Sequence, residues 1–146
     1  MIAGIVGLGL IGGSFAKAYA EAGHTVWACD AQRSVLDFAM LSGVVKSELT
    51  QENIARCDIV LVCIFPAAAV DYVRTAAPYI GTHPVVIDCC GTKRGICADI
   101  FPLAKEYGFT YLGGHPMAGN HNSGFKYARA NLFKGAPMVI VPADFD

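Results

Sequence analysis

The sequence is poor in charged residues and has no run of Lys or Arg. Charged side chains make up 16% of the 146 residues, and the formal net charge is -1 at pH 7. A surface that binds nucleic acid neutralises phosphate groups with clustered basic side chains. The composition therefore argues against nucleic acid as a partner.

Long apolar runs are missing as well. The apolar stretches at 2–6, 59–65, 85–87 and 138–141 are far shorter than the ~20 residues that a membrane-spanning helix needs. The chain also begins directly with a strand-like segment, without the basic region that opens a signal peptide. These absences predict a cytoplasmic protein that does not contact a membrane.

The sequence contains six cysteines but no C-x-x-C pair. Several of them end apolar, strand-like runs, which predicts reduced, buried thiols that act as small hydrophobic residues. A zinc site made of Cys89, Cys90 and a histidine is the weaker alternative. The six are Cys29, Cys57, Cys63, Cys89, Cys90 and Cys97.

The length and the hydrophobic content indicate one domain. Hydrophobic residues make up 54% of the chain, which is enough for a well-filled core in 146 residues. No internal repeat or low-complexity linker divides the sequence. We therefore expect a single domain over 1–146.

Short β-branched segments alternate with longer helical ones along the chain. Helices are predicted over 11–22, 34–42, 67–79 and 95–107, with a further helical piece near 125–133. Strands are predicted over 2–6, 25–29, 44–45, 58–65, 85–88, 111–113 and 138–141. Because most strands are continuous apolar runs, they are expected to be buried on both faces. The pattern predicts a doubly wound α/β fold of the Rossmann type, with a mainly parallel sheet and helices on both faces.

A G-x-G-x-x-G fingerprint lies between the first strand and the first helix. Gly7 suits the tight turn, Gly9 allows the backbone to approach a pyrophosphate, and Gly12 allows the helix to pack closely on the sheet. The start of the helix supplies free N–H groups and a partial positive charge for the phosphates. A glycine-rich turn without a ligand is the alternative. The candidate cofactor-binding residues here are Gly7, Leu8, Gly9, Leu10, Ile11 and Gly12.

Asp30 ends the second strand, at the offset where an acidic side chain binds the adenosine ribose hydroxyls of a dinucleotide. A carboxylate at this position repels a 2′-phosphate, which favours NAD over NADP. Arg33 is the competing signal, because its guanidinium can pair with a 2′-phosphate or stack on adenine. We expect NAD, with NADP as the less favoured cofactor.

Phe65 and Pro66 follow the fourth strand at the carboxyl edge of the sheet, where ligands of open α/β folds bind. They are therefore candidates to line the dinucleotide. An ordinary strand-to-helix turn, with proline opening the helix, explains them equally well.

The segment 113–119 reads GGHPMAG and places His115 after two glycines and before a proline. We expect this segment to be a loop at the same carboxyl edge. A histidine there can accept a proton near neutral pH, although one held by ordinary loop contacts fits the pattern too. Asn120 and His121 lie just downstream and are candidates to reach the same pocket.

A second candidate substrate segment follows the fifth strand. Gly91 and Thr92 can present backbone and hydroxyl donors to a substrate, and Lys93 can attract an anion. A solvated lysine is at least as consistent with the spacing alone.

Together these motifs resemble the dinucleotide-binding domain of the prephenate dehydrogenase (TyrA) family. The resemblance rests on the glycine fingerprint, on DCCGTK at 88–93, on GGHPMAG followed by NHNSGF, and on Asn131-Leu132-Phe133. It extends over nearly the whole chain, and GGHPMAG with Ser123-Gly124 is its most specific part.

The resemblance implies a reaction and a role for His115. This residue corresponds to the catalytic histidine, which takes the proton of the C4 hydroxyl of prephenate as hydride leaves for the nicotinamide of NAD. Loss of the ring carboxylate as CO2 then gives 4-hydroxyphenylpyruvate in tyrosine biosynthesis. The small-molecule substrate implied is therefore prephenate.

The chain departs from the family pattern at two positions. Gly91 stands where the family often has a serine near the substrate, so Thr92 or a backbone group has to serve instead. His121 stands where an acidic residue is common, and its charge changes near neutral pH.

Members of the family continue into a helical domain that dimerises and contributes cations for the substrate carboxylates. That domain is absent from these 146 residues. The resemblance therefore implies a homodimeric full-length protein, and an isolated domain that binds NAD but is poorly active or inactive alone.

Two kinds of alternative function remain. Within the same enzyme class, the alternatives are an arogenate or cyclohexadienyl dehydrogenase, or a more distant hydroxyacid or imine reductase. From another class, the alternative is a non-catalytic Rossmann module that senses a nucleotide. A sensor needs the phosphate loop and Asp30 but no histidine at the reaction edge, so GGHPMAG argues against it.

Overall fold

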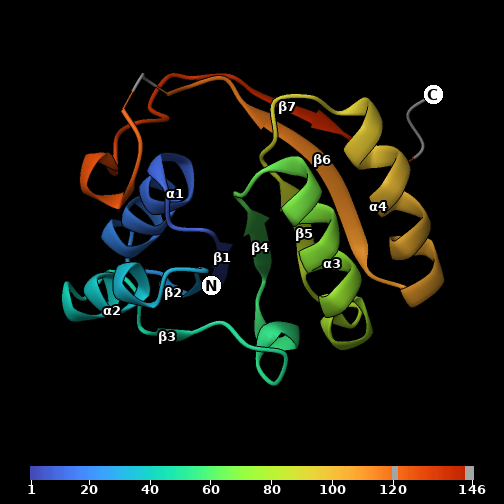
Figure 1. Ribbon diagram of the computed structural model, residues 1–146, viewed down its shortest axis with the longest axis horizontal. Helices are drawn as coiled ribbons and strands as arrows, with labels where there is room; N and C mark the ends of the chain where they lie inside the picture. The colour runs from blue at the N-terminus through green and yellow to red at the C-terminus, as the bar shows by residue number, and fades with distance from the viewer. Residues whose placement is uncertain (120–121, 144–146) are drawn as a thin grey trace.

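The strands form one sheet in the order β3-β2-β1-β4-β5-β6-β7 (Figure 1). The structure is a computed structural model that describes residues 1–119 and 122–143. The first six strands of the chain pair in parallel, and β7 pairs antiparallel to β6. Their bounds are β1 Ile2–Val6, β2 Thr25–Cys29, β3 Ser47–Glu48, β4 Ile59–Val62, β5 Val85–Asp88, β6 Thr110–Pro116 and β7 Met138–Val141. The predicted Rossmann-type fold is confirmed.

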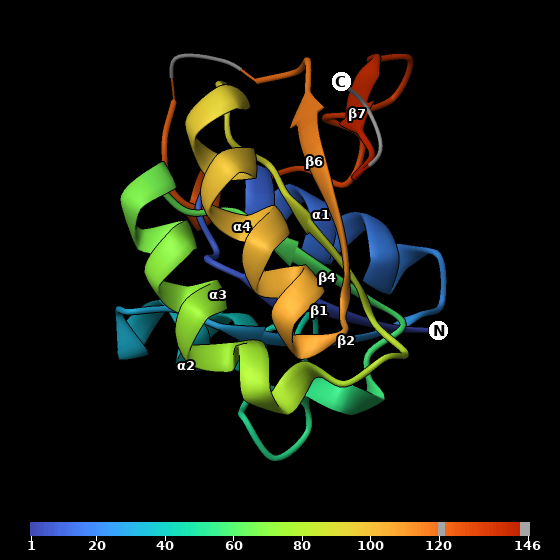
Figure 2. The ribbon, with the colours of Figure 1, turned by 90° about the vertical axis from the view of Figure 1, so that its right-hand side faces the viewer.

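In the described part of the chain, four α-helices connect the parallel strands. They are α1 Leu10–Glu21, α2 Arg33–Leu41, α3 Pro66–Ile80 and α4 Arg94–Tyr107, with 3-10 turns η1 at Ile54–Arg56 and η2 at Phe125–Tyr127. In Figure 1, α1 and α2 lie on one side of the sheet and α3 and α4 on the other. Figure 2 looks from the side of α4, which packs against β6. No helix in 1–119 or 122–143 is long and apolar enough to cross a membrane.

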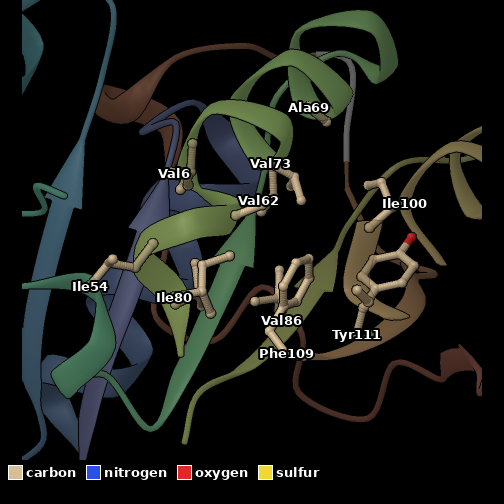
Figure 3. Packing of buried hydrophobic residues seen from close by; sticks show 14 of the residues in the cluster. Val6, Ile54, Val62, Ala69, Val73, Ile80, Val86, Ile100, Phe109 and Tyr111 are labelled. Carbon is tan, nitrogen blue, oxygen red and sulfur yellow. The ribbon is translucent and has the colours of Figure 1, made fainter. Parts of the chain in front are cut away.

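Each face of the sheet has its own hydrophobic core. In β4, Val60 and Val62 pack with the α3 and α4 side, whereas Leu61 between them packs with the α1 and α2 side. Figure 3 shows the first core, in which Val73 of α3 and Ile100 of α4 lie near strand residues. Burial of alternate residues on opposite faces explains why the strands are continuous apolar runs.

The third strand and the last helix differ from expectation. The third strand is at Ser47–Glu48 rather than at 44–45, because Val45 is used as a buried core residue before β3 pairs with β2. The helix expected near 125–133 is the single turn η2. That segment is held by contacts with α1 instead of by its own helical ladder.

His115 lies in a strand and not in the expected loop. β6 continues through Pro116, because Gly114 pairs with Ile140 and His115 pairs with Val139 of β7. The preceding glycines make this path possible. A Cβ at Gly113 would lie 2.7 Å from the Cys97 Sγ, and a Cβ at Gly114 would lie 2.6 Å from the Asp88 carbonyl oxygen. Two glycines therefore mark a tightly packed strand here.

Asp58 joins three segments at the amino edge of the sheet. Its Oδ2 accepts a hydrogen bond from the Ile2 backbone N–H at 2.6 Å, and its Oδ1 lies 2.8 Å from the His83 Nε2. The Ile2 hydrogen bond, followed by that of His83, lowers the pKa of Asp58. A carboxyl whose pKa is lowered by folding adds stability above its unfolded pKa of about 3.9, and this stability is lost as the pH falls through the folded value.

We expect Asp58→Asn to lower the melting temperature by a few degrees at pH 7 and to flatten its fall between about pH 5 and pH 3. The measurement is thermal unfolding by circular dichroism across that pH range. Parallel curves for wild type and variant would contradict this role of Asp58.

Candidate functional site

A cavity of about 510 Å³ opens at the carboxyl edge of the sheet. It lies between the glycine loop after β1 and the segments that follow β2, β4 and β5. Of the predicted cofactor residues, eight line it: Gly7, Leu8, Gly9, Leu10, Ile11, Asp30, Phe65 and Pro66. A larger cavity of about 650 Å³ between α4 and β6 has a mainly apolar lining and lies away from the glycine loop. We take the first as the candidate site.

The three fingerprint glycines meet different steric demands. Gly7 has φ +92°, and a Cβ there would lie 2.5 Å from the Ile64 Cγ2. A Cβ at Gly12 would overlap the Gly7 carbonyl oxygen. A Cβ at Gly9 would meet no atom of the described residues within 4 Å, so this glycine borders open space. Gly7 and Gly12 thus fix the turn, and Gly9 leaves room for a ligand.

The start of α1 is suited to an anion. Gly9 is the N-cap, and within the described chain its first turn has neither a side-chain cap nor an acidic residue. The free N–H groups and the helix dipole therefore face the cavity without a competing negative charge from that turn. This is the arrangement expected for a phosphate-binding loop.

Asp30 connects the glycine loop to the end of β2. Its Oδ2 accepts the Leu8 backbone N–H at 2.8 Å, and its Oδ1 accepts the Gln32 backbone N–H at 2.8 Å. A carboxylate oxygen can accept more than one hydrogen bond, so Asp30 can also accept bonds from ribose hydroxyls in the cavity.

Arg33 lies outside the cavity lining, as does Gly12. The Arg33 Nε is 3.0 Å from the Asp37 Oδ1, and its Nη1 is 2.8 Å from the Glu48 Oε1. Two carboxylates on α2 and β3 therefore engage the guanidinium that was expected near the adenosine. This pairing raises the pKa of Arg33, first through Glu48.

Of the candidate substrate residues, Gly91 lines the cavity and is adjacent to His115. A Cβ at Gly91 would lie 3.9 Å from the His115 Cε1. The His115 Nδ1 is buried and has no hydrogen-bond partner within 1–119 and 122–143. Thr92 is exposed and does not line the cavity. Asn120 and His121 lie outside the described residues.

Lys93 makes an ion pair with Asp88 rather than standing free for an anion. Asp88 ends β5 and is fully buried, and the Lys93 side chain is 16% exposed. The Tyr111 hydroxyl donates to the same carboxylate at 2.6 Å. Burial, and then this hydrogen bond, raise the pKa of Tyr111, so the hydroxyl keeps its proton.

Two thiols of the cavity wall, those of Cys63 and Cys90, have raised pKa values that favour the protonated form. Burial, followed by the nearby Asp88 charge, raises the pKa of Cys90 to about 12, and the hydrogen bond to Cys89 raises that of Cys63. All six cysteines, which fall within the described residues, are free. In that same part of the chain, no three His, Cys, Asp or Glu residues are grouped as metal ligands.

Sequence reasoning did not assign Ser123 and Gly124 to the site, yet both line the cavity. They precede residues 125–128, a segment that packs across α1. The Lys17 Nζ donates to the carbonyls of Phe125 at 3.3 Å and Ala128 at 2.8 Å. A Cβ at Gly13 would lie 2.8 Å from the Phe125 ring, so this glycine permits the close crossing. The sequence signal for this crossing is Gly13, the glycine that directly follows Gly12 of the fingerprint.

A mainly parallel sheet, a glycine loop that opens the first helix and a cavity at the carboxyl edge define a Rossmann-type nucleotide-binding domain. The family model "Prephenate dehydrogenase, nucleotide-binding domain" matches residues 15–146. The chain therefore belongs to the prephenate dehydrogenase family, as its nucleotide-binding domain.

Relatives of this chain extend the comparison. A probable prephenate dehydrogenase, NovF of Streptomyces niveus, is 30% identical over 95% of this chain and 37% of its own length. The crystal structure of Synechocystis arogenate dehydrogenase is 27% identical, with a TM-score of 0.90 over 99% of this chain and 51% of that one. A prephenate dehydrogenase from A. aeolicus, solved with hydroxyphenyl propionate and NAD+, shares the fold at 24% identity and a TM-score of 0.85, over 100% of this chain and 52% of that one. The chain thus spans about half or less of these relatives.

Gly9→Ala separates stability from binding. Gly9 has φ -78°, which alanine adopts readily, and its Cβ would meet no described atom within 4 Å. We expect unchanged or slightly higher thermal stability, together with about tenfold weaker NADH binding, because the methyl group enters the space left for phosphate. Differential scanning fluorimetry and NADH fluorescence titration measure the two effects. Retained NADH affinity would contradict the assignment of the loop.

Proposed function

We propose that this chain is the NAD-binding, histidine-bearing domain of an enzyme that converts prephenate to 4-hydroxyphenylpyruvate by oxidative decarboxylation. The observation that carries the proposal is the position of the His115 ring beside Gly91. Gly91 lines the cavity that begins with the glycine loop, whereas His115 lies behind it and is not itself part of the lining. A nucleotide-binding module without chemistry would not need a histidine there.

The residues of this chain suggest a division of roles. The glycine loop and the start of α1 bind the pyrophosphate, Asp30 binds the ribose, and Phe65 and Pro66 flank the dinucleotide. The bound nicotinamide ring supplies the acceptor for a hydride from the carbinol carbon. His115 accepts the proton of the same carbinol. Because the Nδ1 is buried, we assign the Nε2 as the atom that accepts this proton. Loss of the carboxylate as CO2 then makes the ring aromatic.

Arogenate is the alternative substrate, and the high structural similarity to the Synechocystis arogenate dehydrogenase favours it. Prephenate and arogenate differ in the side chain, which is a keto acid in one and an amino acid in the other. Comparison of both substrates with the full-length gene product, followed as NADH formation, identifies the preferred one. If the full-length gene product oxidises neither prephenate nor arogenate, the proposed function is refuted.

His115→Asn tests the proposed base. General-base catalysis contributes about 10²- to 10⁴-fold, so we expect kcat in the full-length gene product to fall at least about a hundredfold. The dissociation constant for NADH should stay within about twofold, because the loop and Asp30 are untouched. Unchanged turnover would remove His115 from the mechanism.

We also propose that activity requires a second region, which supplies cations for the two carboxylates of prephenate and forms a homodimer. Lys93 pairs with Asp88, and Lys126 lies over the Tyr127 ring, with its Nζ 4.9 Å from the centroid. Both cations therefore have partners inside this domain. The 146-residue chain should bind NADH but turn over poorly, and robust prephenate oxidation by it alone would overturn this part.

We propose NAD rather than NADP as the cofactor, and the ion pairs of Arg33 support this choice. Its guanidinium contacts Asp37 and Glu48, so a 2′-phosphate would have to compete with two carboxylates. Asp30 would add repulsion on the ribose side.

Releasing Arg33 should weaken this preference. We expect Asp37→Asn with Glu48→Gln to raise NADPH affinity about threefold to fivefold, because exposed ion pairs are weak and compete only modestly for the guanidinium. NADH affinity should change little. Adding Arg33→Ala to the double variant should abolish the gain, and both ligands are measured by fluorescence titration. Tighter binding of NADPH than NADH by the wild type would contradict the proposed cofactor.

A further inference from the structure

Asp88 is a fully buried carboxylate that accepts hydrogen bonds from four donors among the described residues. It is the last residue of β5, at the edge where the cavity opens. Its Oδ1 accepts the Tyr111 hydroxyl at 2.6 Å and the Gly114 backbone N–H at 3.3 Å. Its Oδ2 accepts the Cys90 backbone N–H at 3.0 Å and the Lys93 Nζ. One side chain thus joins β6 to the turn before α4.

Two of these donors are backbone N–H groups of residues adjacent in sequence to His115 and to Gly91. Gly114 directly precedes His115 in β6, and Cys90 directly precedes Gly91. Gly91 in turn lies beside the His115 ring, with its Cβ position 3.9 Å from the Cε1. The carboxylate is therefore hydrogen-bonded both to the strand that carries His115 and to the turn beside its ring.

The backbone around Asp88 leaves little freedom for other arrangements. Asp88 is in register with Gly113, and a Cβ at Gly114 would lie 2.6 Å from the Asp88 carbonyl oxygen. Lys93 supplies the counter-charge, because a buried carboxylate without a cation is costly. The positive charge of Lys93 is thus used inside the domain.

We propose that Asp88 is a positioning residue that sets the placement of the His115 imidazole relative to the cavity. The proposal rests on the proposed function in so far as His115 is the base. Asp88 holds β6 through Oδ1 and the Cys90–Gly91 turn through Oδ2, and Lys93 neutralises it. Loss of these bonds lets the turn shift relative to the strand, and the His115 ring beside the turn loses its fixed orientation.

Asp88→Asn is the main test. Asparagine preserves the size of the side chain, but its NH2 group cannot accept hydrogen bonds, so one pair of donors loses its acceptor. We expect kcat of the full-length gene product to fall about 10- to 100-fold, since small displacements of a catalytic group have effects of that order. The dissociation constant for NADH should stay within about twofold. The His115 ring-carbon NMR resonance of the ligand-free 146-residue chain should move from its wild-type position.

Asp58→Asn is the matched control. It is the same substitution in a carboxylate of the same sheet, but at the amino edge, where Asp58 bonds Ile2 and His83. It should lower thermal stability while leaving kcat and the His115 resonance as in wild type. An equal loss of kcat in both variants would show a general effect of destabilisation and would overturn the proposal.

Further variants keep the test decisive if Asp88→Asn does not fold. Asp88→Asn combined with Lys93→Met removes both charges, and Tyr111→Phe removes one donor to Oδ1. Each should fold, lower kcat and move the His115 resonance, with the smaller effect in Tyr111→Phe. Folded variants with wild-type kcat and an unmoved resonance would overturn the positioning role. If the wild-type enzyme oxidises neither prephenate nor arogenate, the proposed function fails, but the resonance still decides the role of Asp88.

Discussion

Close approach of the backbone to its neighbours at glycine is the constraint on which the carboxyl edge of this sheet depends. At the first crossover, Gly12 lets α1 lie against the Gly7 carbonyl, and Gly7 lets the loop lie against Cys63 and Ile64 after β4, so that a Cβ at either glycine has no space. At the fifth and sixth strands, Gly113 and Gly114 bring β6 against the Cys97 thiol and the Asp88 carbonyl. The first contact shapes the phosphate loop, and the second brings His115 beside Gly91. Both halves of the candidate site therefore depend on missing side chains.

Much of the fold follows from the sequence because its signals are local and mutually consistent. Val60, Leu61 and Val62 face alternate cores, and a strand buried on both faces is recognisable as a continuous apolar run. The glycine fingerprint predicts the first turn for the same reason, since its conformation is imposed within six residues. His115 was found from its neighbours, but its setting was misjudged. Two glycines suggested a loop, whereas they serve a strand that packs too tightly for any Cβ.

Contacts between distant residues were beyond the reach of sequence patterns. Nothing local indicates that Lys17 binds the carbonyls of Phe125 and Ala128, more than a hundred positions away. The return of residues 123–124 to the glycine loop depends on that contact. Lys93 is a different case, because Asp88 is only five positions before it in the sequence. The spacing alone did not show whether the Lys93 side chain pairs with this carboxylate or faces a ligand, and the fold pairs it with Asp88.

The position of His115 within β6, rather than in a loop, affects the conformational entropy of ligand binding. The strand runs three residues beyond the point where Asp88 pairs with Gly113, and β7 supports that extension from the other side. The backbone at His115 therefore loses its conformational freedom when the chain folds, at a cost of ~1–2 kcal/mol per residue. A histidine on a mobile loop would lose the same freedom each time a ligand bound. Here ligand binding starts from a residue whose backbone is already ordered.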